Sequence, residues 1–402
     1  MRFLKCFAVA LQDFDFAYGK LCLTINAIVP AIGPPAPVPA DARPCDIYDA
    51  AGTPCVAAHS MVRALYSSYD GPLYMVSRSS DHATKSIPTT MPGGFADAAI
   101  QDDFCAGTEC TVETIFDQSP RGNHLRSNHP GRHYPVDRGV NASRHPITIA
   151  GHHVYGAWFD PGMGYRNDNT SGMALGQEAE SIYAVFGGGH YNDMCCFDYG
   201  NAENHIGADG PGTMEAIYFG SCTSWWVPSA RRKIPASWHG PYLMADIEAG
   251  MYAGNDTFNP RGSPINFDFV SLMLKGRECE MSLKAGDAQV IHWCTIVAHF
   301  RNARVMSYHE DKQQMKPFAN PPSHPTCAPQ GGHLITKYDG GRPTHADYHP
   351  MRKQGGLVLG TGGDNSDRAL GIFYEGAIAR GYASVATDNA IQANIVAAGY
   401  DK

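Results

Sequence analysis

Two carboxylate residues, Asp246 and Glu248, lie two positions apart in the stretch Leu243–Gly250. If this stretch is a β-strand, their side chains share one face, and the apolar residues between them occupy the other. Repulsion and partial desolvation would then separate their pKa values, which is how one carboxyl group becomes a catalytic acid or nucleophile. A half-buried strand with an acidic outer face would carry the same pattern.

A second acidic site, Asp364, follows the apolar run Leu357–Leu359. The glycines between them allow a tight bend that would place Asp364 at the end of a buried strand. The spacing does not match a dinucleotide-binding loop, and no Gly-Lys-Ser/Thr follows. Taken alone this is a turn-forming aspartate, but together with Glu248 it becomes a candidate general acid.

The chain has 12 cysteines, and several are close in sequence. Because no Cys-x-x-Cys pair or zinc-spaced histidine cluster accompanies them, small disulfide loops in an oxidising compartment are favoured over metal sites. We therefore expect a secreted glycoprotein with no metal and no cofactor. The closely spaced cysteines are Cys45 with Cys55, Cys105 with Cys110, and Cys195 with Cys196, and the glycosylation sequons begin at Asn141, Asn169 and Asn255.

Residues 1–43 are predicted to be a secretory leader followed by a Pro-rich spacer. Arg2 and Lys5 precede a short apolar run, and Ala40-Asp41-Ala42 resembles a small-residue cleavage site. The catalytic unit is then expected to cover residues 44–402.

Composition favours a strand-rich protein without a nucleic-acid or membrane partner. The 402 residues include 43 Gly and 28 Pro, with 10% aromatic and 17% charged residues. A net charge of −8 offers no basic stripe for phosphates. No apolar run reaches the roughly 18 residues that a membrane helix needs. We expect a soluble monomer.

Short strand candidates separated by turn residues predict an all-β sandwich with a few short helices. Helices are expected at 58–66 and from Thr387 or Asp388 to Ala397. The strand candidates are Leu73–Ser77, Thr111–Phe116, Ser181–Phe186, Met214–Phe219, Tyr242–Ala249, Ile265–Leu274, Gly356–Leu359 and Gly371–Ile378.

The segment 291–334 has neither strand alternation nor helical period, and it is rich in histidine and proline. A loop of this length is unusual inside a compact domain. Its histidines could bind a metal, but their irregular spacing favours a disordered insertion, which could also be a translated intron.

Several strings closely resemble the catalytic domain of the fungal α-L-arabinofuranosidase B family, glycoside hydrolase family 54. The resemblance runs from Pro44 almost to the C-terminus and is interrupted at 291–334. Among the strings that carry it are Phe104-Cys-Ala-Gly-Thr-Glu-Cys, His190-Tyr-Asn-Asp-Met-Cys-Cys-Phe-Asp-Tyr-Gly-Asn-Ala-Glu, Met244-Ala-Asp-Ile-Glu and Gly362-Gly-Asp-Asn-Ser.

The resemblance implies a concanavalin-like β-sandwich and a retaining glycosidase. It assigns Glu248 as nucleophile, Asp364 as acid/base and Asp246 as a ligand of sugar hydroxyls. Retention needs two carboxyl groups about 5–5.5 Å apart, one attacking the anomeric carbon and one moving the proton.

The resemblance also implies further substrate-binding residues. Cys195 and Cys196 match a vicinal disulfide that forms an apolar platform, Trp225 matches an aromatic wall, and Gly363 matches a backbone contact. Ala249, where the family has Asn, and Gly250 follow the nucleophile and are expected to line the same site.

The resemblance predicts a secreted, exo-acting α-L-arabinofuranosidase that removes terminal arabinofuranosyl units from plant cell-wall arabinan or arabinoxylan. Two alternatives remain open. One is a sister pentosidase such as a β-xylosidase, and the other is a catalytically weak, lectin-like sandwich that binds arabinose. Glu215 and Glu375 are further candidate catalytic residues, ranked below Glu248 and Asp364.

Overall fold

A computed structural model describes residues 41–223, 235, 237–254, 259–294, 306–309, 314–317, 327–343 and 348–401. The predicted leader falls almost entirely outside these residues. Within them, the helices are α1 (Pro44–Ala50), α2 (Ala98–Phe104) and α4 (Val385–Ala397). No helix in this part of the chain is both long and apolar enough to cross a membrane.

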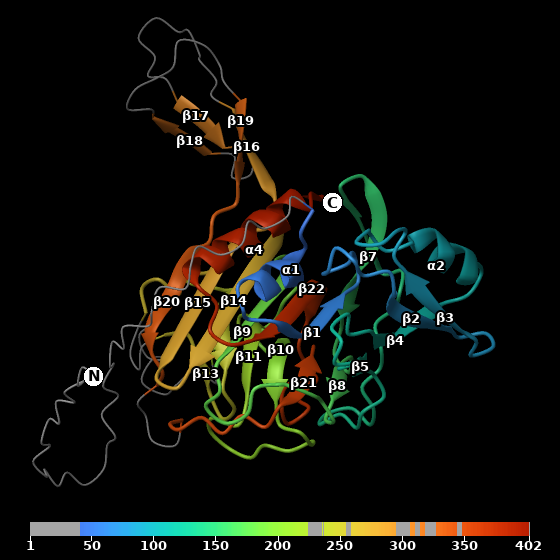
Figure 1. Ribbon diagram of the computed structural model, residues 1–402, viewed down its shortest axis with the longest axis horizontal. Helices are drawn as coiled ribbons and strands as arrows, with labels where there is room; N and C mark the ends of the chain where they lie inside the picture. The colour runs from blue at the N-terminus through green and yellow to red at the C-terminus, as the bar shows by residue number, and fades with distance from the viewer. Residues whose placement is uncertain are drawn as a thin grey trace, which may run out of the picture. The chain divides into compact units, whose positions relative to one another are not determined.

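Most of the described chain forms two large antiparallel sheets, which confirms the predicted all-β class (Figure 1). Sheet 1 contains, in spatial order, β20 (Ile335–Gly341), β15 (Glu280–Asp287), β14 (Phe269–Arg277), β9 (Glu180–Gly187), β22 (Gly371–Arg380), β7 (His152–Phe159), β6 (His145–Ile149) and β23 (Tyr400–Asp401), with β1 (Cys55–Ser60) also paired to β22. Sheet 2 contains β13 (Met251–Tyr252), β12 (Tyr242–Asp246), β11 (Glu215–Gly220), β10 (Asp198–Ala202), β21 (Gly356–Leu359), β8 (Tyr165–Asn167), β5 (Leu125–Arg126), β4 (Cys110–Ile115), β2 (Pro72–Arg78) and β3 (Thr84–Pro88).

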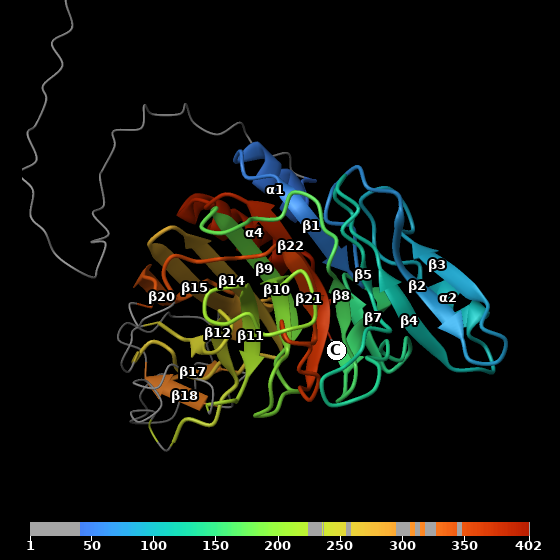
Figure 2. The ribbon, with the colours of Figure 1, turned by 90° about the horizontal axis from the view of Figure 1, so that it is seen from below.

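The two sheets pack face to face, as the two views of the ribbon show (Figure 2). Strands β11 and β12 of sheet 2 contact β14 and β15 of sheet 1. Aromatic rings fill the space between them: Phe186 and Phe373 from sheet 1 meet Phe197 and Tyr199 at β10, at centroid distances of 4.8 and 5.4 Å. This packing fixes β10 against the core and leaves its other face toward the site described below.

Strands with apolar runs form where the sequence predicts them, at β2, β4, β9, β11, β21 and β22. Strand β14 also forms, but it starts at Phe269, later than predicted. The helix predicted at 58–66 is wrong: residues 55–60 form β1, which is buried along its length beside β22. A short, continuously apolar run in a central strand cannot be told from a helix by periodicity.

Helix α4 starts earlier than predicted. Its N-cap is Ser384, whose hydroxyl oxygen accepts a hydrogen bond from the Thr387 amide at 3.1 Å. The cap at Thr387 or Asp388 is therefore wrong, because both residues lie inside the first turns.

The segment 291–334 contributes secondary structure that the sequence did not predict. Strands β16 (Val290–Cys294), β17 (Met306–His309), β18 (Gln314–Pro317) and β19 (Cys327–Gly331) pair in an antiparallel sheet of order β18-β17-β16-β19. That this segment is an insertion dispensable for the catalytic unit stays a prediction.

Disulfides close small loops, as the cysteine spacing suggested. The bonds are Cys45–Cys55, Cys105–Cys110 and Cys195–Cys196. The first ties α1 to β1, so the start of the domain is covalently joined to sheet 1.

Two of the candidate acids form buried ion pairs. Arg63 Nε and Nη2 donate to the two carboxylate oxygens of Glu375 at 2.6 and 2.7 Å. Glu215 pairs with Arg342 and Lys353 at 2.9 and 3.0 Å. Burial opposes ionisation of Glu215, but these two cations outweigh it and lower its pKa to about 2. Both carboxylates therefore have structural partners, and neither lines the pocket that holds Glu248.

Replacing Glu375 should test this structural assignment. Glu375→Gln leaves the Arg63 guanidinium buried without its counterion, so we expect a loss of about 3–5 kcal/mol in unfolding free energy, measured by urea denaturation. The double variant Arg63→Met/Glu375→Leu should lose less than Glu375→Gln. At a temperature where Glu375→Gln stays folded, its turnover in the hydrolysis that the sequence resemblance predicts should match that of the parent, and a loss of a hundredfold or more would contradict a purely structural role.

Candidate active site

One pocket of about 510 Å³ collects most of the predicted site residues. It is lined by Arg132, His133, Met194, Cys195, Cys196, Ala208, Asp246, Glu248, Ala249, Gly250, Met251, Gly362, Gly363, Asp364, Ser366 and Arg368. A second pocket, of about 560 Å³ beside Tyr66 and Tyr69, contains none of the predicted catalytic or substrate-binding residues. The first pocket, although it is the smaller of these two, therefore holds the candidate catalytic residues.

Asp246 and Glu248 reach the pocket from a hairpin and not from one continuous strand. The predicted strand Tyr242–Ala249 ends at Asp246, and the chain returns as β13, with Asp246 opposite Met251. The four residues between form the turn, in which Glu248 and Ala249 have φ of 59° and 56°. The prediction that Asp246 and Glu248 share one face of a β-strand was therefore wrong. Glu248 lies in the turn after β12 and reaches the pocket from there.

Glu248 sits in a desolvated and negatively charged environment. Its residue is 8% exposed, and its backbone N–H donates to Asp246 Oδ1 at 3.1 Å. Burial and then the neighbouring charges of Asp246 and Glu203 raise the pKa of Glu248. Non-glycine residues in the left-handed region are uncommon, and they concentrate at functional sites.

Glu203, the last residue of the string that contains both platform cysteines, is a second acid beside this nucleophile candidate. It is fully buried, and Thr213 Oγ1 donates to its Oε1 at 2.5 Å. The side chains of Glu203 and Glu248 are in contact, which for two carboxyl groups requires a proton between them. When Glu248 reacts as a carboxylate, that proton must reside on Glu203.

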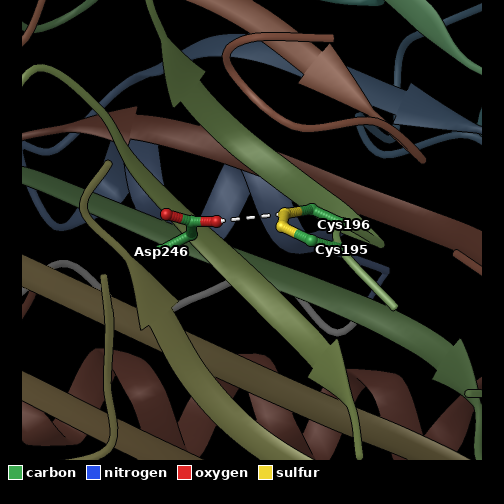
Figure 3. Close-up of side chains that lie close together, drawn as sticks. All are labelled: Cys195, Cys196 and Asp246. Carbon is green, nitrogen blue, oxygen red and sulfur yellow. Dashed lines mark hydrogen bonds between the residues drawn. A yellow bond between two sulfur atoms is a disulfide. The ribbon is translucent and has the colours of Figure 1, made fainter. Parts of the chain in front are cut away.

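The oxidised pair Cys195–Cys196 forms one side of the pocket, and Figure 3 shows the Asp246 carboxylate directed at it. Asp246 Oδ2 lies 3.3 Å from Cys196 Sγ. A disulfide sulfur has no proton to donate, so this is a close packing contact unless Asp246 itself is protonated. The three side chains group as metal ligands would, but disulfide sulfurs are not thiolates and are poor ligands. The arrangement suits a sugar, with an apolar surface beside a hydrogen-bonding carboxylate.

Asp364 is held on a short loop after β21, as the glycine-rich sequence predicted. Its Oδ1 accepts hydrogen bonds from the Ser366 amide at 2.9 Å and from the Ser366 hydroxyl at 2.6 Å. Arg132 forms an ion pair with the other oxygen. The side chain is 17% exposed and lines the pocket with Glu248. These contacts orient the carboxylate and favour its ionised form.

Gly363 is a glycine because two carboxyl groups approach its α-carbon. A β-carbon there would overlap Glu203 Oε2 and lie 2.9 Å from Glu248 Oε2. The loop that carries Asp364 therefore packs directly on the acidic end of the pocket, and any side chain at 363 would push the two apart.

A fully buried arginine, Arg166 of β8, connects the loop that carries Asp364 to the end of β10 at Glu203. Its guanidinium donates to the carbonyl oxygens of Gly363 and Glu203, each at 2.6 Å, and to that of His205 at 2.5 Å. It also forms an ion pair with Asp168. Arg166 was not singled out from the sequence, because the partners that tie it to the site are backbone atoms distant in sequence.

Four predicted residues contribute less to the site: Trp225 and the three sequon asparagines. Trp225 and the sequon at Asn255 lie outside the described residues. Of the other sequons, Asn169 is exposed, and Asn141 accepts a hydrogen bond from the Ser143 amide at 3.0 Å. Glycosylation at these positions stays a prediction.

The family described as "Alpha-L-arabinofuranosidase B, catalytic" matches residues 44–315 and 325–401. The chain belongs to this family. The match includes most of 291–334, so the family resemblance extends further into that segment than the sequence strings suggested.

Individual arabinofuranosidases agree with this membership. A probable α-L-arabinofuranosidase B of Aspergillus fumigatus is 44% identical over 365 residues, covering 89% of this chain and 62% of that protein. A Trichoderma koningii protein named arabinofuranosidase/β-xylosidase is 43% identical, covering 89% and 63%. The chain thus spans less than two-thirds of the length of these relatives.

Solved arabinofuranosidase structures share the fold. One, complexed with arabinofuranosyl-α-1,2-xylobiose, has a TM-score of 0.74 and 39% identity over 89% of this chain and 66% of that one. Another, a glycoside hydrolase family 54 α-L-arabinofuranosidase soaked with a cyclic sulfate inhibitor, has the same TM-score and coverage at 40% identity. These similarities support comparing the residues of this pocket with the roles that the arabinofuranosidase B resemblance implies.

Ala249, where the arabinofuranosidase B resemblance expects Asn, is exposed at the pocket and adopts a left-handed backbone. Its carbonyl oxygen accepts a hydrogen bond from the Tyr348 hydroxyl at 2.8 Å. Alanine in this conformation costs about 1–2 kcal/mol, whereas Asn and Gly tolerate it. A backbone effect and a side-chain effect on substrate can therefore be separated by comparing those two residues.

We expect Ala249→Asn and Ala249→Gly both to raise the melting temperature by a few degrees. Only Ala249→Asn should raise kcat/KM for a nitrophenyl arabinofuranoside, by several-fold to about tenfold, because it alone adds a hydrogen bond of about 0.5–1.5 kcal/mol. An equal gain in kcat/KM for both variants would instead assign the effect to the backbone.

Proposed function

We propose that this chain is a secreted, retaining, exo-acting α-L-arabinofuranosidase that releases terminal arabinofuranosyl units from arabinan or arabinoxylan. The observation that carries the proposal is one pocket holding Glu248, Asp364, Asp246 and the Cys195–Cys196 disulfide, in a chain of the arabinofuranosidase B family. The small disulfides support an oxidising, extracellular location.

In the first step, the Glu248 carboxylate attacks the anomeric carbon of the sugar. Asp364 gives its proton to the glycosidic oxygen, the bond to the leaving group breaks, and a covalent glycosyl–enzyme forms. The bound sugar excludes water from Glu248, which strengthens attraction between its carboxylate and the developing positive charge at the anomeric carbon.

In the second step, Asp364 acts as a base and takes a proton from a water molecule that attacks the anomeric carbon. Glu248 leaves as a carboxylate. Because each of the two displacements inverts the anomeric carbon, the product keeps the configuration of the substrate. The Ser366 hydrogen bonds and the Arg132 ion pair favour the ionised Asp364 that this step needs. In the first step the same contacts oppose the protonation that Asp364 needs in order to act as the acid.

Substrate orientation is assigned to the two unlike sides of the pocket. The disulfide sulfurs offer a polarisable, apolar surface for the C–H face of a furanose, and Asp246 offers acceptors for its hydroxyl groups. One relative is complexed with arabinofuranosyl-α-1,2-xylobiose, which supports an arabinoxylan side chain as the natural target.

A sister β-xylosidase activity is the second candidate, and it has its own support. One relative is named for both activities, and a pocket for one pentose discriminates weakly against another of similar size. Comparing kcat/KM on nitrophenyl α-L-arabinofuranoside and nitrophenyl β-D-xyloside separates the two. Binding of arabinose without hydrolysis of either compound would favour the lectin-like alternative.

Glu248→Gln should abolish turnover, because an amide cannot form the glycosyl ester. We expect a loss of at least about 10⁴-fold in kcat with an unchanged melting temperature. Glu248→Gly, which leaves room for an external nucleophile, should regain activity with azide and give an arabinosyl azide of inverted configuration. Glu215→Gln is the matched control for azide, and its rate should not respond. Near-parental activity of Glu248→Gln would exclude the assignment.

Asp364→Asn should affect substrates according to their leaving groups. A nitrophenolate needs little protonation, so the rate of glycosyl–enzyme formation should fall far less for a dinitrophenyl arabinofuranoside than for an arabinoxylan oligosaccharide. Pre-steady-state bursts measure this step separately from the second one. An equal loss for both substrates would remove Asp364 from the acid role.

A further inference from the structure

Asp198, the first residue of β10, is a buried acid to which no role has been given above. It follows the platform residue Cys196 by two positions, and its residue is 0% exposed. The next residue, Tyr199, points into the core, where its hydroxyl is 3.0 Å from His59 Nδ1. Because side chains alternate along a strand, Asp198 points the other way, toward the side of sheet 2 that carries the pocket.

The strand register places Asp198 near Asp246. Asp198 is opposite Tyr218 on β11, and Tyr218 is opposite Met244 on β12, two residues before Asp246. Beside Asp246, the facing positions on β11 and β10 are Ala216 and Gly200, which have little or no side chain. A side-chain hydrogen bond joins the carboxyl groups of Asp198 and Asp246 across this gap.

Hydrogen bonding decides which of the two aspartates carries a proton. Neither carboxyl oxygen of Asp198 accepts a hydrogen bond from a described donor. Asp246, by contrast, accepts the Glu248 amide at 3.1 Å. A fully buried carboxylate without any donor is strongly disfavoured, and two carboxylates cannot bond to each other without a proton. The proton therefore belongs on Asp198, which becomes the donor.

We propose that Asp198 is a protonated positioning residue that donates a hydrogen bond to Asp246 and thereby keeps Asp246 an ionised acceptor for the sugar hydroxyls. This inference rests on the proposed arabinofuranosidase function. Asp198 would then help to position both the disulfide platform and Asp246. It follows Cys196 by two positions at the start of β10, and its hydrogen bond reaches Asp246.

The surrounding charges agree with this protonation pattern. Burial and then Asp246, with a smaller contribution from Glu248, raise the pKa of Asp198 well above its ordinary value. Burial raises the pKa of Asp246 to about 6, with Glu203 adding to the rise, while the Glu248 amide and the Asp198 hydrogen bond lower it. Tyr218, which faces Asp198 from β11, stays neutral because burial raises its pKa.

The test compares Asp198→Asn with Asp198→Ala in the full chain, using pH profiles of kcat/KM. Asn can still donate to Asp246, so we expect an efficiency within about threefold of the parent and an unmoved acid limb. Ala removes the donor, which makes Asp246 easier to protonate. Its KM should rise, its kcat/KM should fall by at least tenfold, and its acid limb should move to higher pH.

The opposite sign would overturn the proposal. If Asp198 were ionised, both substitutions would remove a negative charge and move the acid limb to lower pH. An Asn variant as impaired as the Ala variant would also contradict a donor role. Melting temperatures of both variants separate loss of fold from loss of positioning.

A spectroscopic readout keeps the inference testable even if the protein hydrolyses no arabinofuranoside. The infrared carbonyl band of a protonated carboxylic acid is resolved from carboxylate bands. At neutral pH it should be weaker in Asp198→Asn than in the parent, whereas the exposed control Asp103→Asn should leave it unchanged. An unchanged band in Asp198→Asn would refute the protonated state, whatever the activity.

Discussion

Negative charge gathered in a desolvated region is the constraint on which the site depends. Four carboxyl groups, those of Asp198, Glu203, Asp246 and Glu248, lie at one end of the pocket and are at most 8% exposed. In such surroundings they cannot all be ionised, since each further charge costs desolvation and repulsion together. The contacts pair Asp198 with Asp246 and Glu203 with Glu248. Each pair can then hold one proton and present one carboxylate, and the members that line the pocket are Asp246 and Glu248.

Two buried acids outside the pocket are neutralised by cations, unlike these four. Glu375 has Arg63, and Glu215 has Arg342 and Lys353. At the pocket the buried cation Arg166 is directed to backbone carbonyl groups instead, where it joins the Gly363 loop to the strand end at Glu203. The four carboxyl groups are thus held in position without a directly paired cation among the described residues, whereas Asp364 pairs with Arg132.

The sequence predicted the parts of this structure that depend on local pattern. Apolar runs located β2, β4, β9, β11, β21 and β22 and parts of β12 and β14, close cysteines indicated disulfides, and glycines before Asp364 indicated a bend. It failed where non-local geometry decides. Apolar and acidic residues alternate through Glu248 as they would in a strand. No residue type in the string Ile-Glu-Ala-Gly predicts that Glu248 and Ala249 adopt left-handed backbone in a turn. The strand β10, which begins at Asp198 and ends just before Glu203, was not predicted, and only the pairing of β10, β11 and β12 brings Asp198 near Asp246.

Covalent trapping tests the central claim most directly, because it reports the nucleophile itself. The protein would be incubated with an arabinofuranose-configured cyclic sulfate, the class of inhibitor soaked into one related structure. Intact-mass and peptide mass spectrometry would then locate the adduct. The account predicts one adduct per chain, on Glu248. An adduct on Asp364 or Glu203, or none while the compound still inhibits, would contradict it.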